Sequence, residues 1–283
     1  MRRLTIFLTC MIVSITLTLQ VLANTFVTDG LVSYWPFDKQ HIRNNKIKDV
    51  WGENDGTSGG NPKMVPGKVG EALEFDGLDD YVNLTNLGDF GSQLGSSTFE
   101  AWINVGHKND PMILFRIRDT CMRWEFVINS GMKGTKDQIR HIIAHKVGAR
   151  CHGYIRDLKP TTISDGKWHH LVYTNEIVIG DTPAKRKMLQ DCVYIDGKLF
   201  SFGTLPLRQP ATFVPFEIPF ILGAEGKHGN QTSFFKGTID EVRIYNRVLT
   251  EAEVIQNFAS KIGYSVEPNN KLPITWATLK SDF

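Results

Sequence analysis

Short runs in which apolar and polar residues alternate, or in which nearly every residue is apolar, make up most of this 283-residue sequence. Gly, Pro, Asn and Asp separate the runs. In Thr98–Val105 every second residue is apolar, namely Phe99, Ala101, Ile103 and Val105. A period of two places these side chains on one face of a β-strand, so the run predicts a strand that covers a core on one side.

The number of such runs and the turns between them predict the fold class. Asp196-Gly197 stands between two strand-like runs and is typical of a tight β-hairpin. We therefore expect an all-β protein, folded as a two-sheet antiparallel β-sandwich or jelly roll. With 41% hydrophobic residues, the chain is long enough for one large domain with a substantial core.

One segment has helical character, Leu249–Phe258 near the end of the chain. Thr250 can accept the first free backbone amide while Glu253, three residues later, reaches back to it, which is a capping box. Val254, Ile255 and Phe258 would then share the face that packs on the sandwich. The sequence therefore predicts one short C-terminal helix.

The two ends of the chain differ from its body. Residues 1–23 combine Arg2 and Arg3 with an apolar run and small residues before a cleavage point, which indicates a secretory signal peptide rather than a retained membrane anchor. We expect residues 24–30 to be a short linker, 31–262 to be the folded domain and 263–283 to be a C-terminal tail. The mature chain would be secreted, periplasmic or on the cell surface, and without a membrane span.

Charge and cysteine content narrow the class of protein further. The chain carries 32 Lys and Arg against 30 Asp and Glu, and cleavage removes two Arg, so the mature chain is nearly neutral and nucleic acid is not an expected partner. Cleavage also leaves Cys121, Cys151 and Cys192, an odd number for an exported protein. One disulfide and one free thiol are expected, and all three pairings are possible.

Several segments, in this order along the chain, resemble a known family. They include Tyr34–Asp38 (YWPFD), Phe75–Val82 (FDGLDDYV), Gly166–Val172 (GKWHHLV) and Gly237–Leu249 (GTIDEVRIYNRVL). From about residue 30 to residue 260 the chain resembles the bacterial laminin-G-like, concanavalin A-like jelly-roll domain. The tail resembles short C-terminal segments of related exported bacterial proteins.

The resemblance implies a non-catalytic binding or adhesion module whose ligand is a glycan or a component of the extracellular matrix. Aromatic residues such as Trp124 could stack on sugar rings, although Trp124 could equally belong to the core. A purely structural spacer is a further interpretation.

The alternative to a binding module is an enzyme, a glycoside hydrolase on the same fold. Glu74, Asp76 and Asp79 have the spacing E-x-D-x-x-D, close to the carboxylate array of laminarinase-type glucanases. In those enzymes the carboxylates follow one strand, with the acid and the nucleophile about 5–5.5 Å apart. Here Gly77 predicts a turn that diverts Asp79 from the strand, so we interpret the segment as strand-turn-strand. A hydrolase would use Glu74 with Asp76 or Asp79.

Metal sites are predicted at two places by relatives of the fold. Related jelly rolls hold a structural Ca²⁺ between an early acid and the last strand, and the matching positions are Asp38 and Asp240. The alternative is that Asp38 forms a local turn and that Asp240 is bonded to backbone amides. Pentraxins, which share the fold, suggest a second calcium site at Asp119 and Glu225, where the cation of Lys227 argues against it.

A zinc site is suggested only superficially by four residues in Ile139–Gly153, namely His141, His145, Cys151 and His152. On a strand, His141 and His145 stand roughly 13 Å apart, which is too far to share one ion. We therefore interpret these residues as decoration of a strand.

Overall fold

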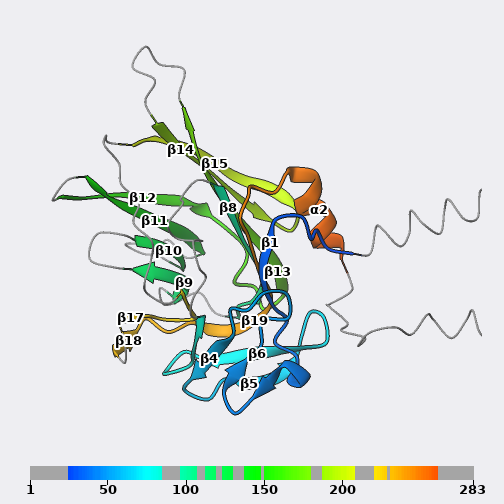
Figure 1. Cartoon of the computed structure of the whole chain (residues 1–283). Coiled ribbons are helices and arrows are strands. Elements are labelled where there is room, and N and C mark those ends of the chain that lie inside the picture. The colour runs from blue at the N-terminus through cyan, green and yellow to red at the C-terminus, as the bar shows by residue number, and fades with distance from the viewer. Residues whose placement is uncertain are drawn as a thin grey trace, which may run out of the picture.

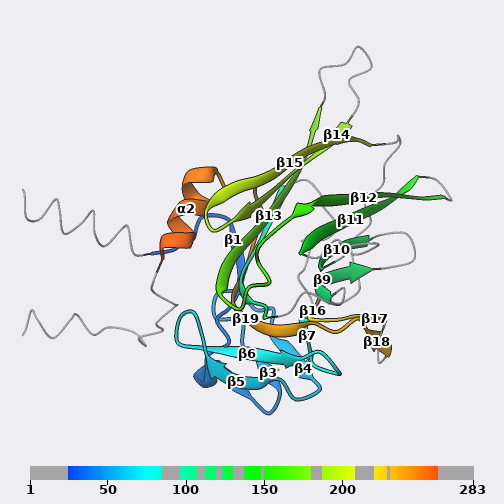
Figure 2. The same cartoon turned by 180° about the vertical axis from the view of Figure 1, so that it is seen from behind.

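The structure is a computed structural model that describes residues 25–84, 96–106, 112–118, 123–129, 137–147, 150–179, 187–207, 220–227 and 230–260. In these residues two large antiparallel sheets form a sandwich, with a single short α-helix beside them (Figure 1, Figure 2). The predicted all-β sandwich with a short C-terminal helix is thus confirmed. The expected signal peptide and tail lie outside the described residues.

The strands of the two sheets come from the whole length of the described chain. Sheet A contains, in spatial order, β15 (Lys198–Pro206), β14 (Lys187–Ile195), β13 (Trp168–Ile179), β8 (Ser96–Asn104), β19 (Lys236–Tyr245), β6 (Glu71–Asp76) and β5 (Lys63–Pro66), and β1 (Leu31–Trp35) also pairs with β19. Sheet B contains β12 (Arg150–Pro160), β11 (Gln138–Val147), β10 (Arg123–Ile128), β9 (Met112–Arg118), β16 (Phe220–Leu222), β7 (Tyr81–Leu84), β4 (Gly56–Gly59), β3 (Lys46–Ile47) and β2 (Ile42–Arg43). The remaining elements are the 3-10 turn η1 (Lys39–His41), the hairpin of β17 (Glu225–Lys227) with β18 (Asn230–Thr232), and the helix α2 (Glu251–Ala259).

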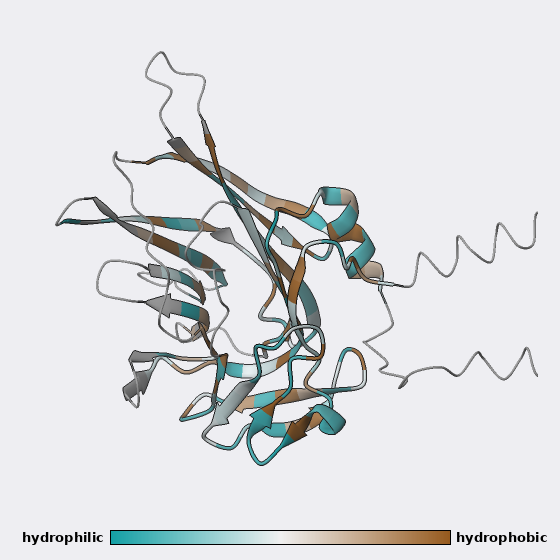
Figure 3. Ribbon diagram, in the orientation of Figure 1, coloured by the Kyte–Doolittle hydropathy of each residue, from teal (hydrophilic) through white to brown (hydrophobic). Residues whose placement is uncertain are grey.

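The inner faces of the two sheets form the core. Hydrophobic and hydrophilic residues alternate along many strands, as the period of two predicts (Figure 3). Five aromatic side chains pack together between the sheets: Phe99, Phe115, Trp124, Phe126 and Phe220. Trp124 is only 2% exposed. The suggestion that Trp124 stacks on a sugar is therefore wrong, because its ring belongs to the core.

Helix α2 packs on the outer face of sheet A, beside β13 and β15 (Figure 1, Figure 2). Its predicted capping box is present, with Thr250 and Glu253 each accepting a hydrogen bond from the other's backbone N–H. The predicted buried face is only partly correct. Val254 is buried, but Ile255 is 49% exposed, and the other buried residue of the helix is the polar Asn257. Asn257 is buried because its amide bonds groups beneath the helix.

A polar network lies under α2 and links three sequence-distant strands. Arg243 on β19 donates hydrogen bonds to Glu100 on β8, at 2.7 Å, and to Glu241. The Tyr34 hydroxyl on β1 donates to Glu241 at 2.6 Å. Asn257 of α2 donates to Glu100 at 2.6 Å. These charged groups are buried, so the network is paired inside the protein rather than with water.

The segment before β1 belongs to the same layer. Phe26 and Val27, in the stretch expected as a linker, are buried in a cluster with Tyr34 and Val254. The Val27 N–H donates to the Asn257 side chain at 2.7 Å. The N-terminal segment and α2 therefore hold each other on the outer face of sheet A.

Cys192 on β14 carries a free thiol, so the two expected pairings that use Cys192 are not formed. Burial raises the pKa of this thiol, which disfavours the reactive thiolate. Cys121 and the side chain of Cys151 lie outside the described residues.

Within the described part of the chain, we find no helix with the length and apolar character needed to cross a membrane.

Candidate functional site

The acidic segment between β6 and β7 is a tight turn, as the sequence indicated. Gly77 has a φ of 81°, which an L residue adopts at a cost, and Asp76 accepts the Leu78 N–H at 2.7 Å across the turn. Asp80 is buried and accepts the backbone N–H groups of Asp76, at 2.9 Å, and Asn61, at 2.6 Å. Burial, with the nearby charges of Asp76 and Asp79, raises the pKa of Asp80.

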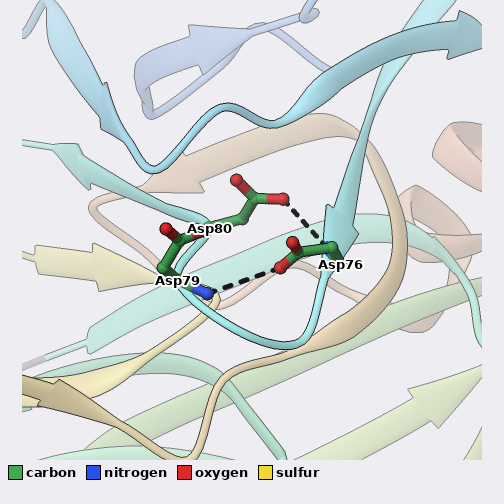
Figure 4. A group of neighbouring side chains, drawn as sticks. All are labelled: Asp76, Asp79 and Asp80. Atoms are coloured by element: carbon green, nitrogen blue, oxygen red, sulfur yellow. Dashed lines mark hydrogen bonds between the residues drawn. The ribbon is translucent and has the colours of Figure 1, made fainter.

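The carboxylates of Asp76, Asp79 and Asp80 come together within this turn (Figure 4). Each of them can offer an oxygen within 4.8 Å of the others. Both oxygens of Asp80 already accept backbone N–H groups, and so does one oxygen of Asp76. These hydrogen bonds explain the cluster: the carboxylates of Asp76 and Asp80 stabilise the turn.

Glu74 lies just before the turn, on the outer face of sheet A. Leu73 and Phe75 point into the core while Glu74 and Asp76 are exposed, which is the alternation expected for β6. Glu74 lies opposite Lys63 of β5 on one side and opposite Thr238 of β19 on the other.

A cavity of about 680 Å³ opens beside this part of sheet A. Glu74, Asp76 and Asp80 line it, and Asp79 is not among its lining residues. The polar side chains that complete its lining come from other strands or loops: Asn61, Lys63, Asn104, Lys236 and Thr238. Sequence reasoning did not single these residues out as a site, and only the register between strands brings them together.

The cavity is suited to a neutral or mixed-charge polar ligand. Lys63 and Lys236 donate hydrogen bonds, Glu74 and Asp76 accept them, and Asn104 does both. Glu74 and Asp76 are both exposed to solvent, and the buried carboxyl of the cavity, Asp80, uses both of its oxygens to accept backbone N–H groups. The cavity therefore offers donors and acceptors to a ligand rich in hydroxyl groups.

Gly106, just after β8, forms an open part of the cavity wall. A Cβ atom added there would meet no other atom within 4 Å. A side chain can therefore be introduced at this lining position without a clash at its Cβ atom.

Asp240, expected to bind calcium, is buried and surrounded by backbone donors. Its carboxylate accepts the N–H groups of Lys68, at 2.8 Å, Val69, at 3.1 Å, and Glu241, at 2.8 Å. Three N–H dipoles present their positive ends to this carboxylate, and such a donor set does not fit a cation.

Asp38, the other expected calcium ligand, binds the end of the loop whose start, at Lys68 and Val69, is bound by Asp240. It accepts the Glu71 N–H at 2.9 Å. In the described ranges, no cluster of three or more potential metal-ligand side chains includes Asp38 or Asp240. Both carboxylates fasten the loop from Gly67 to Glu71 to the sandwich.

The remaining predicted ligands do not come together in the described residues. Asp119 lies outside them, and Glu225 pairs with Arg116 at 2.6 Å. His141 is buried beside Asp191, and burial lowers its pKa to about 3. The register of β11 and β12 places His145 opposite His152, and the side chains of His145 and Cys151 lie outside the described residues.

We expect the stability of the protein to depend on pH through Asp240. Burial, followed by the charge of Glu241, raises the pKa of Asp240 to about 8. Because this pKa is higher than in the unfolded chain, the contribution to stability is complete below about pH 4 and is lost as the pH rises through about 8. The melting temperature should therefore fall as the pH rises from about 4 to about 8, and Asp240→Asn, which cannot ionise at this position, should show a flatter pH profile.

Scanning calorimetry of both proteins, with and without a chelator, checks this expectation. Addition of chelator should leave both profiles unchanged. A melting temperature that rises with added Ca²⁺ at about pH 8, and only in the parent protein, would show instead that a cation holds the Asp240 carboxylate.

Comparison with solved structures finds the same fold in several proteins. Domain 4 of AbnA, a GH43 extracellular arabinanase from Geobacillus stearothermophilus, was solved in complex with arabinotriose; it is 22% identical with a TM-score of 0.53, over 81% of this chain and 98% of that one. A Trypanosoma rangeli sialidase in complex with sialic acid is 19% identical with a TM-score of 0.56, over 83% of this chain and 33% of that one.

The binding domain of botulinum neurotoxin serotype D/C is 14% identical with a TM-score of 0.54, over 81% of this chain and 52% of that one. The chain thus spans about a third of the sialidase and about half of the neurotoxin domain, and at these identities the likeness concerns the fold alone. A search of curated proteins found no match.

A family model described as the concanavalin A-like lectin/glucanases superfamily matches residues 75–255. This stretch begins in β6, at the edge of the cavity, and ends within α2. It contains β8 and β19, which supply Asn104 and Thr238 to the cavity. The chain belongs to the concanavalin A-like lectin/glucanase superfamily.

Proposed function

We propose that this chain is an exported, non-catalytic binding module that recognises carbohydrate through the cavity on the outer face of sheet A. The observation that carries the proposal is the lining of the cavity, in which carboxylates, two amides, a hydroxyl and two ammonium groups face one space. A polyhydroxylated ligand needs donors and acceptors in such a mixture. The leader-like residues 1–23 support export, and with it access to glycans or extracellular matrix.

The solved structures of the same fold support carbohydrate as the ligand class. The AbnA domain was solved in complex with arabinotriose, and the cell entry of botulinum neurotoxin type C depends on interaction with two ganglioside molecules. Calcium is not required by this proposal, because the side chains of the cavity can form hydrogen bonds with a sugar directly.

The proposal is tested by filling the cavity. Gly106→Leu should place its side chain inside and weaken binding of any glycan found on an array by at least about tenfold, which corresponds to about 1.4 kcal/mol. Isothermal titration calorimetry on the mature chain measures the affinity. Gly153→Leu is the matched control, because an added Cβ at this exposed position of β12 makes only ordinary contact, at 3.5 Å from the Ala144 Cβ. Equal binding by parent protein and Gly106→Leu would place the ligand elsewhere.

The hydrolase alternative is supported by one observation, that Glu74 and Asp76 line the same cavity. The two functions separate in one assay. Incubation of the parent protein with β-glucans and arabinans should release no new reducing ends. Release that Glu74→Gln abolishes would establish hydrolysis instead.

A further inference from the structure

The cavity continues into a straight row of side chains that crosses sheet A. Lys63 of β5 pairs with Glu74 of β6, Glu74 with Thr238 of β19, Thr238 with Asn104 of β8, and Asn104 with Trp168 of β13. Residues paired directly across neighbouring strands point to the same face of a sheet. These five side chains therefore project from the outer face in one line, perpendicular to the strands.

The row is the border of the uncovered part of this face. Two residues along β6, β19, β8 and β13, toward α2, the residues that project on the same side are Ala72, Asp240, Trp102 and His170, and all four are at most 2% exposed, whereas Val65 on the edge strand β5 is half-buried. Lys68 and Phe258 cover Trp102 there. A ligand on the open part of the face cannot extend toward the helix, and the row offers it side chains across the strands.

The length of the row indicates the size of the ligand. Five adjacent strands are separated by four spacings of about 4.8 Å, so the row is about 19 Å long. One sugar ring would occupy only a fraction of this length. A linear chain of several rings would contact all five positions.

The chemistry changes along the row in a way that suits such a chain. Lys63, Glu74, Thr238 and Asn104 offer donors and acceptors for hydroxyl groups. Trp168, at the far end and only half-buried, offers an indole face, on which the apolar side of a sugar ring packs. Trp168 does not line the cavity itself, so it would contact only a ligand long enough to leave it.

We propose that the outer face of sheet A binds a linear oligosaccharide that runs across the strands from β5 to β13, with Trp168 as a specificity-determining residue for ligand length. This inference rests on the proposed function, since it concerns the same site. It predicts selection for internal segments of a polysaccharide rather than for a single terminal sugar.

Calorimetry with arabino-oligosaccharides and cello-oligosaccharides of one to six units tests the inference. For the series that binds, the affinity of the parent protein should rise with length until the row is filled. Trp168→Ala should weaken the longest ligands about tenfold and leave the shortest unchanged, Trp168→Phe should restore part of the loss, and Gly106→Leu should weaken all lengths. Phe202→Ala, at an exposed aromatic on β15 at the other end of the sheet, is the control and should change nothing.

The outcomes separate the two proposals. Binding that is weakened by Gly106→Leu, yet independent of length or insensitive to Trp168→Ala in a protein that melts normally, would overturn the oligosaccharide row and leave the proposed function standing. Absence of binding throughout both series and a glycan array would overturn the proposed function and the row with it.

Discussion

Replacement of Arg243 by methionine is expected to lower the free energy of unfolding by about 3–5 kcal/mol. The guanidinium is buried and donates to Glu100 and Glu241. It also lies over the rings of Phe26 and Tyr34, at 4.3 and 4.4 Å from their centroids. Methionine fills most of the volume but leaves two buried carboxylates without their cation, and a buried charge without a partner is strongly destabilising.

The lowered pKa of Glu100 agrees with this expectation. Burial opposes the charge on Glu100, yet His170 and Arg243 lower the pKa of this carboxyl to about 2. Glu100 is therefore charged in the folded protein at neutral pH, and the Arg243 guanidinium supplies the opposite charge beside it.

Urea unfolding followed by tryptophan fluorescence measures the loss. Arg140→Met is the matched control, because Arg140 makes a two-bond ion pair with Asp157, at 2.5 and 2.8 Å, on the partly exposed surface of sheet B. Surface pairs of this kind contribute about 0.2–1 kcal/mol. If the two variants lose the same stability, burial is not what makes the Arg243 network important.

Asn257→Leu is expected to cost about 2–4 kcal/mol, the second largest effect, since it removes one hydrogen bond to a charged group and two to neutral ones. The side-chain oxygen of Asn257 accepts the Val27 N–H. Its nitrogen donates to Glu100 and to the Tyr245 hydroxyl, the latter at 3.0 Å. Leucine is a better helix former than asparagine, so any loss must come from the groups left unpaired beneath α2.

Gln256→Leu on the same helix is the control. Gln256 donates to the Thr25 carbonyl at 3.0 Å, but this contact is exposed to solvent, which can replace it. We expect a change within about 0.5 kcal/mol. Hydrogen exchange at Val27 adds an independent readout, because Asn257→Leu should expose this amide while Gln256→Leu should not.

Local patterns were sufficient to predict the elements of this protein. The period of two identified strands such as β6 and β8, Gly77 marked a turn, and Thr250 with Glu253 marked the start of α2. Each of these features is decided by residues at most a few positions apart. Alternation also places Trp124 on one face of β10, but it does not say which face is inside, and so Trp124 remained ambiguous until the second sheet was in place.

The candidate site was decided by tertiary structure alone. Lys63, Glu74, Asn104, Trp168 and Thr238 lie on five strands from distant parts of the sequence, and only the order and register of sheet A align them. A strand can pair with many others at nearly equal backbone energy, so packing of the whole core selects its partner. Asp240 shows the same division. The sequence by itself determined that an acid stands in the last strand, but only the folded loop brings the backbone N–H groups of Lys68 and Val69 to its carboxylate.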